Sequence, residues 1–130
     1  MAESPAASDK PVLQKLLYKP GMRAMVLNAP QSYQQVLQEI PGVTQQLGDG
    51  PFEFIHVFAT ERAEVTQDGR KWRAALKPGG VIWVSYPKGR AVPTDLNRDS
   101  LRTVLLTVGL DPIAQVAIDD VWSALRAKLI

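Results

Sequence analysis

The chain has 130 residues, a formal net charge of +2 and no cysteine. That length suits one domain with a single hydrophobic core, and the lack of cysteine excludes disulfide bonds, thiolate nucleophiles and cysteine-ligated zinc. A pI near 9.0 accompanies an almost balanced charge, so it gives little reason to expect a nucleic-acid partner. No apolar run reaches the roughly 18 residues of a membrane span. We therefore expect a cytoplasmic protein without a membrane partner.

The N-terminal end carries small and acidic residues where a signal peptide has a basic start and an apolar stretch. We expect residues 1–10 to form a flexible tail and residues 11–130 to form one Rossmann-like α/β domain. Val12 to Leu17 predicts one or two helical turns. After a turn at Lys19-Pro20-Gly21, the apolar run from Arg23 to Ala29 predicts a buried strand.

A helix is predicted to start at Pro30, because a first-turn residue needs no N–H partner. One apolar face follows at helical spacing and ends at Pro41-Gly42; it comprises Tyr33, Val36, Leu37 and Ile40. Val43 to Leu47 predicts a short strand. Phe52 to Ala59 is apolar on both faces, which is typical of a central strand of a parallel sheet.

The next predicted helix has Thr60 as its N-cap, reaches about Leu76 and breaks at Asp68-Gly69. The sequence KPGG closes this helix, and Val81 to Pro87 predicts the next buried strand. Thr94 or Asp95 then starts another helix that ends at Gly109; its apolar stripe is Leu101, Val104, Leu105 and Val108.

Asp111-Pro112 predicts a turn into a strand from Ile113 to Asp119. The spacing after Val121 fits a strand and a helix equally well. Strands that alternate with helices predict a single-domain, mostly parallel sheet flanked by helices. In such sheets ligands bind beyond the carboxyl ends of the strands, near the point where the strand order reverses.

Several segments resemble a family of small bacterial proteins of unknown function. They are KPGMRAMVLNAP, FEFIHVFA, LKPGGVIWVSYPK, TDLNRDSLR and IDDVWSALR, and the match covers about Leu17 to Leu129. The most specific parts are Tyr86–Lys88, Thr94–Asp99 and Asp119–Arg126. That family resembles a shortened class I methyltransferase fold. The resemblance implies that the C-terminal segment is a strand of an antiparallel β-hairpin return. It carries no established catalytic residue.

The glycine-rich loop of such methyltransferases is missing. S-adenosylmethionine is held there by a motif like D/E-x-G-x-G-x-G after the first strand, whereas Leu27 to Tyr33 reads LNAPQSY, without glycine or acid. The acid that bonds the ribose in that family has only Asp49 as a nearby candidate. We therefore expect no cofactor, and we expect a non-catalytic binding or interaction module, because a fold does not fix a function.

Three further features have structural interpretations that we favour. His56 is the only histidine and lies among phenylalanines, which is typical of a hydrogen-bonded core residue. The RKWR stretch, Arg70 to Arg73, could contact RNA, but an exposed helix face with Trp72 in the core fits better. Asp119 and Asp120 favour a turn over a metal site, since neighbouring strand residues point to opposite faces. We expect no metal site.

A polar loop from Tyr86 to Arg98 follows a predicted central strand and leads into a helix N-terminus, where anions are attracted. With the turn after the first strand it forms our candidate ligand site, in which Lys88 and Arg98 face one cleft. The candidate residues are Pro30, Tyr33, Tyr86, Lys88, Arg90, Thr94, Asn97 and Arg98. The alternative is that Thr94, Asp95 and Asn97 only cap the helix.

The function predicted from the sequence is binding of a small anionic ligand or a protein partner. One alternative is a divergent S-adenosylmethionine-dependent methyltransferase with another cofactor grip. A weaker alternative is an RNA-associated protein that uses the RKWR stretch and the loop bases. Binding of S-adenosylmethionine distinguishes the first two, and salt-dependent RNA binding distinguishes the third.

Overall fold

The computed structural model describes residues 11–130; the tail predicted for residues 1–10 lies outside the described residues. Two short helical segments flank the first strand, and two longer helices follow the second and third strands. The elements are α1 (Val12–Lys15), β1 (Ala24–Leu27), the 3-10 helix η1 (Gln31–Tyr33), α2 (Gln34–Leu37), β2 (Phe52–Phe58), α3 (Arg62–Ala75), β3 (Leu76–Pro87), α4 (Arg98–Thr107), β4 (Leu110–Ala117) and β5 (Trp122–Leu129).

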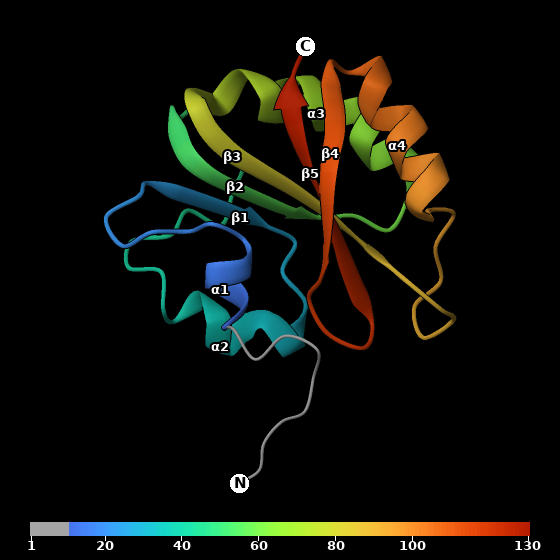
Figure 1. Cartoon of the computed structure of the whole chain (residues 1–130), viewed down its shortest axis with the longest axis horizontal. Coiled ribbons are helices and arrows are strands. Elements are labelled where there is room, and N and C mark those ends of the chain that lie inside the picture. Colours follow the sequence, from blue (N-terminus) through green and yellow to red (C-terminus); the bar gives the residue numbers. More distant parts are fainter. Residues whose placement is uncertain (1–10) are drawn as a thin grey trace, which may run out of the picture.

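The five strands form one mixed sheet in the order β1-β2-β3-β5-β4. β1, β2 and β3 are parallel, whereas β5 runs antiparallel between β3 and β4. Figure 1 shows α3 and α4 on one side of the sheet and α1 and α2 on the other. The predicted single-domain α/β fold with a C-terminal antiparallel hairpin is confirmed. β2 lies between two parallel neighbours, which explains why both of its faces are apolar.

Each face of the sheet has its own core. Ile55 and Val57 of β2 pack toward α3 and α4, together with Trp72 and Leu101. Residues on the opposite face of β2 pack toward α1, η1 and α2 with the two other tryptophans; the group includes Phe54, Phe58, Tyr33, Leu37, Trp83 and Trp122. The apolar character predicted for both faces of this strand is therefore confirmed, and it divides the interior into two layers.

Some predicted boundaries were wrong. α3 runs unbroken through Gly69. A Cβ at this position would lie 2.7 Å from Val108 Cγ2 of the segment after α4. The place of this glycine is set by close helix packing and not by a helix break. Gly79 and Gly80 lie inside β3, and Pro112 lies inside β4, where the register shifts as in a β-bulge. The helix predicted from Pro30 is only the short pair η1 and α2.

The segment after α2 pairs with the outer side of β1 at a single residue. Thr44 forms an isolated parallel bridge with Met25; its amide donates to Ala24 O at 2.9 Å and its carbonyl accepts from Val26 N at 2.9 Å. The strand predicted from Val43 to Leu47 is reduced to this bridge. Its position still matters, because the chain lies on one side of β1 at Thr44 and on the other side at β2.

No helix within residues 11–130 is both long and apolar enough to cross a membrane.

Candidate functional site

The strand order reverses at the carboxyl end of β1, since Thr44 lies on one side of this strand and β2 on the other. Ligands of open α/β sheets bind at such a point. The structure has a pocket of about 300 Å³ there, which we call the β1 pocket. It is lined by Leu27, Asn28, Gln45, Gln46, Leu47, Glu64, Asp68 and Trp72.

Three elements position the lining of the β1 pocket. Glu64, Asp68 and Trp72 are spaced by four residues in α3 and so lie on one face of the helix. The two glutamines follow the Thr44 bridge, and Asn28 follows β1. Asp68 Oδ1 lies 3.6 Å from Lys71 Nζ, and the other carboxylate and carboxamide oxygens of this lining accept hydrogen bonds. Trp72 and the two leucines supply apolar surface. The β1 pocket therefore suits a small ligand with hydrogen-bond donors or a positive charge.

The loop after β1 is folded back on the protein. Asn28 adopts a left-handed conformation with φ of 60°, which asparagine tolerates better than most residues. Pro30 is half-buried and precedes η1. Tyr33, a candidate ligand residue, is only 2% exposed and points into the core. This loop has no glycine, so side chains occupy the space beside the backbone.

Tyr33 belongs to a buried chain of three polar side chains. Its Oη lies 2.9 Å from His56 Nδ1, and His56 Nε2 lies 2.6 Å from Ser85 Oγ. His56 and Ser85 are both 0% exposed. A neutral imidazole has one donor and one acceptor nitrogen, so both nitrogens are satisfied. Serine and histidine touch here as in a hydrolase, but complete burial keeps a substrate away from them. The core role predicted for His56 is confirmed.

Burial also shifts the pKa values of His56 and Tyr33. Desolvation lowers the pKa of His56 to about 3, because the charged imidazolium loses its hydration inside the protein. Desolvation likewise raises the pKa of Tyr33 above its usual value. His56 is therefore neutral at physiological pH, and it offers no charge to a ligand or a metal.

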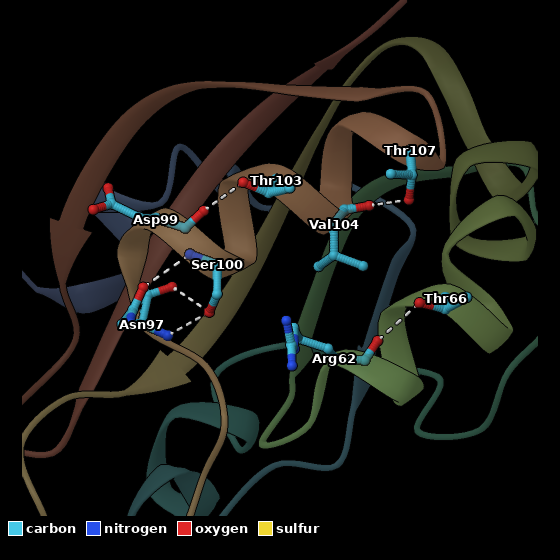
Figure 2. A pocket seen from close by; sticks show the side chains of 8 residues that line it. All are labelled: Arg62, Thr66, Asn97, Asp99, Ser100, Thr103, Val104 and Thr107. Carbon is cyan, nitrogen blue, oxygen red and sulfur yellow. Dashed lines mark hydrogen bonds between the residues drawn. The ribbon is translucent and has the colours of Figure 1, made fainter.

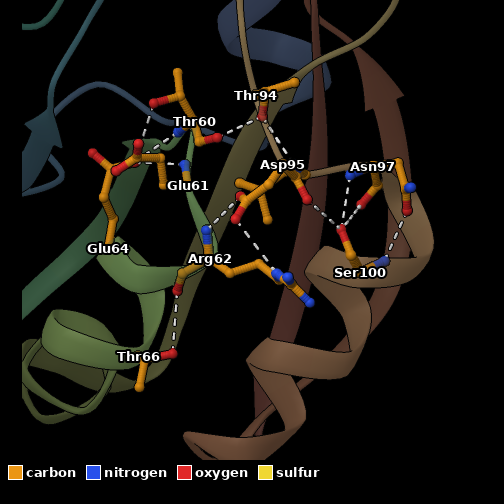
Figure 3. A network of polar contacts seen from close by, with 10 residues as sticks. Thr60, Glu61, Arg62, Glu64, Thr66, Thr94, Asp95, Asn97 and Ser100 are labelled. Carbon is orange, nitrogen blue, oxygen red and sulfur yellow. Dashed lines mark hydrogen bonds and ion pairs between the residues drawn. The ribbon is translucent and has the colours of Figure 1, made fainter.

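The loop between β3 and α4 is bonded to the N-terminus of α3 (Figure 3). Thr94 Oγ1 donates to the Thr60 carbonyl at 2.5 Å, and the backbone N–H of Arg62 donates to Asp95 Oδ1 at 2.8 Å. Glu64 Oε1 accepts from the N–H groups of Thr60 and Glu61 at 2.7 and 2.9 Å. The N-cap of α3 is Glu61 and not the predicted Thr60, and the N-cap of α4 is Asn97 and not Thr94 or Asp95. Carboxylates of the chain itself occupy the positive end of α3.

Asn97 is the N-cap of α4. Its Oδ1 accepts from Ser100 N at 2.8 Å, and Ser100 Oγ accepts from Asn97 N at 2.9 Å. Figure 2 shows these two residues at the end of a groove between α3 and α4. Three threonine hydroxyl groups in this groove donate to backbone carbonyls of their own helices. The bonds are Thr66 to Arg62, Thr103 to Asp99 and Thr107 to Val104. The hydroxyl groups are thus already bonded within the protein.

The remaining candidate residues do not gather in one groove. Arg98 lines a groove between α4 and β4 that neither Lys88 nor Arg90 lines. Lys88 is half-buried, and its backbone N–H donates to Val121 O of the β4–β5 hairpin at 2.7 Å. Tyr86 is 5% exposed, and its hydroxyl accepts from Gln115 Nε2 at 3.0 Å. Binding by these residues stays a prediction.

The RKWR stretch and the paired aspartates have structural partners. Trp72 is buried as predicted, and Arg70 and Arg73 donate to the carbonyls of Thr107 and Gly109 at 3.0 and 3.2 Å. Asp119 Oδ1 accepts from the N–H groups of Val121 and Trp122, both at 2.8 Å. The predicted turn at Asp119 is confirmed.

The β1 pocket was not predicted from the sequence. Its lining comes from three segments, and the amides of Gln45 and Gln46 form no motif in the sequence. The signal that could have found them was the short strand predicted from Val43 to Leu47. If that segment pairs with β1, the residues after it lie at the carboxyl edge of the sheet, beside the end of β1.

No family model and no curated protein matches the sequence. Solved structures do match the fold. The PH0226 protein from Pyrococcus horikoshii OT3 has 11% identity and a TM-score of 0.64, with 92% of this chain and 88% of that chain covered. A SAM-dependent methyltransferase from Aquifex aeolicus has 12% identity and a TM-score of 0.61 over the same shares.

A third similar structure is the 1,6-didemethyltoxoflavin-N1-methyltransferase of Burkholderia thailandensis. It has 10% identity and a TM-score of 0.61, and the match covers 91% of this chain and 75% of that one. The fold is methyltransferase-like. At such low identity the likeness concerns the fold alone, and the chemistry of this protein depends on its own side chains.

Proposed function

We propose that this protein is a non-catalytic binding module that holds a small molecule in the β1 pocket. The observation that carries the proposal is the place and lining of this pocket, at the reversal of strand order and among side-chain oxygens. The ligand carries a positive charge or several hydrogen-bond donors, and it has an apolar part that contacts Trp72 and Leu47. This chemistry differs from the anionic ligand predicted from the sequence.

Two observations support binding without methyl transfer. The loop after β1 sends Tyr33 into the core, where it bonds His56, and it lacks the glycines that let a backbone approach a cofactor closely. The positive end of α3, beside the ends of β2 and β3, is bonded to Asp95 and Glu64. The backbone N–H groups at the carboxyl edge of the central strands are therefore already bonded to side chains of the protein itself.

A divergent methyltransferase is the second candidate function. Its support is the fold, which is shared with proteins such as the Aquifex aeolicus methyltransferase. S-adenosylmethionine carries a positive charge and an amino group, so the lining of the β1 pocket does not by itself oppose it. The two proposals differ in whether this one cofactor binds.

A thermal-shift screen with metabolites sorted by charge tests the proposal. A ligand of the native state raises its stability, so we expect stabilisation by cationic or donor-rich compounds. In the Asp68→Ala variant the dissociation constant of a hit should rise by about tenfold, or ~1.4 kcal/mol. Asp120→Ala at the tip of the β4–β5 hairpin is the matched control and should leave it unchanged. Stabilisation by anions alone, lost on Arg98→Ala, would contradict the proposal.

A further inference from the structure

β4 is the open edge of the sheet. It stands last in the strand order and, within residues 11–130, pairs only with β5. The opposite edge differs, because Thr44 bonds the outer side of β1. Figure 1 shows β4 at this edge next to α4. An exposed strand edge carries unpaired backbone groups that another extended segment can bond.

The direction of the free backbone groups follows from the hairpin. Ile118 N donates to Trp122 O at 2.9 Å, and bonded and non-bonded pairs alternate in an antiparallel ladder. The backbone groups of Gln115 and Ala117 therefore face away from β5. An independent contact agrees, since the carbonyl of Ala117 accepts from Lys15 Nζ at 3.0 Å. Gln115 presents both an N–H and a C=O at the open edge.

A basic groove of about 410 Å³ runs along this edge between α4 and β4. We call it the α4–β4 groove. Arg98 and Arg102 lie one turn apart in α4, and both line it. Pro112 and Leu125 also line it, as does Ile113, which is 47% exposed. The groove thus combines two guanidinium groups with apolar surface.

The acidic groups near the α4–β4 groove do not cancel the positive charge of its two arginines. Asp99 also lines it and lies 3.7 Å from Arg98, but its side chain is 88% exposed and that of Arg98 is 66% exposed. Such exposed ion pairs are weak. Asp111, at the start of β4, stands opposite Lys128 of β5. Arg102 donates only a long bond of 3.4 Å to the Pro112 carbonyl.

We propose that the α4–β4 groove binds an extended, acidic segment of a partner protein, which adds to the sheet beside β4. Its backbone bonds Gln115, and its carboxylates on the α4 side meet Arg98 and Arg102 as charge-assisted pairs. The bulge at Pro112 confines pairing to the residues after it. This surface is separate from the β1 pocket and goes beyond the ligand proposed for that pocket.

A second copy of the chain is a poorer occupant. Antiparallel pairing of two β4 strands would place both α4 helices on the same face of the joined sheet. The arginines of the two copies would then face each other, and like charges at short range repel. An acidic strand has the opposite electrostatics, which is why the charge of the groove favours it.

The test uses a fluorescein-labelled octapeptide of alternating glutamate and valine, with the lysine–valine octapeptide as the charge-reversed match. Fluorescence anisotropy should show saturable binding of the acidic peptide only. The Arg98→Ala/Arg102→Ala variant should weaken it by about tenfold or more, whereas Lys19→Ala in the exposed turn before β1 should not. Thermal unfolding checks that each variant is folded.

Backbone pairing is tested on the peptide, so the protein stays unchanged. Alternate residues of a strand bond a given neighbour, so N-methylation of one alternate set should abolish binding and methylation of the other should spare it. The proposal is overturned if both peptides bind equally, if neither saturates by about 1 mM, or if both methylated sets bind. It is also overturned if sedimentation shows a dimer that Gln115→Pro dissociates.

Discussion

Replacing His56 with alanine is expected to lower the free energy of unfolding by ~2–4 kcal/mol. The ring is fully buried between Tyr33 and Ser85 and stacks on Phe58 with centroids 4.2 Å apart. Its removal leaves a cavity, and it also leaves the Tyr33 and Ser85 hydroxyls without their partner, which adds the cost of buried unsatisfied polar groups. Urea denaturation at pH 7.5 measures the change.

The matched control is Gln35→Ala, an exposed position in α2, where a surface change should stay within about 0.5 kcal/mol. Tyr33→Phe removes one hydroxyl and keeps the ring, so its decrease in the free energy of unfolding should lie between those of Gln35→Ala and His56→Ala. An unchanged denaturation midpoint for His56→Ala would contradict the core role of this residue.

Acid is expected to destabilise the protein well above the pH at which carboxylates titrate. Burial holds the pKa of His56 at about 3 in the native state, against 6.5 for the ordinary value. Between these values the unfolded chain binds a proton that the folded chain does not, so stability is lost as pH falls from about 6.5 toward 3. The slope approaches ~1.4 kcal/mol per pH unit, which amounts to roughly 2 kcal/mol at pH 5.

Because His56 is the only histidine, the interval from pH 7.5 to 5 isolates its effect. The hydrogen bond from the Arg23 backbone is the main cause of a lowered pKa of Glu53. This shift affects stability only below pH 4.5, the ordinary pKa of the group. Urea denaturation at both pH values should show the full loss for the native sequence and little loss for His56→Gln. Equal losses in the two proteins would show that another group is responsible.

Much of the architecture could be predicted from local patterns. The two-faced apolar run of β2 has one arrangement that buries it well, which is a central strand with helices on both sides. The spacing in β5 fitted a strand and a helix equally well, and only the resemblance favoured the strand. Glycine was harder to interpret. Gly69 resembled a helix break, but the sequence cannot show that Val108 lies against it. The close packing of α3 on the segment after α4 decides the role of this residue.

The candidate site was less predictable than the fold. Thr94 and Asp95 are residue types that often serve as N-caps. They do bond the N-terminal end of a helix, but this helix is α3 and not the α4 that follows them. Tyr33 stands beside a strand end in the sequence, yet its ring points inward to His56. Which way such side chains point depends on contacts between distant segments, and these follow only from the assembled sheet.

Calorimetric titration with S-adenosylmethionine tests most directly whether this methyltransferase-like fold acts without that cofactor. The loop after β1 lacks the glycines of the cofactor grip and is held in the core through Tyr33. We therefore predict no binding at ligand concentrations up to about 1 mM. A dissociation constant at this limit corresponds to a binding free energy of only ~4 kcal/mol. Saturable binding with a micromolar dissociation constant, weakened by Asp68→Ala, would contradict the proposed function and favour the methyltransferase.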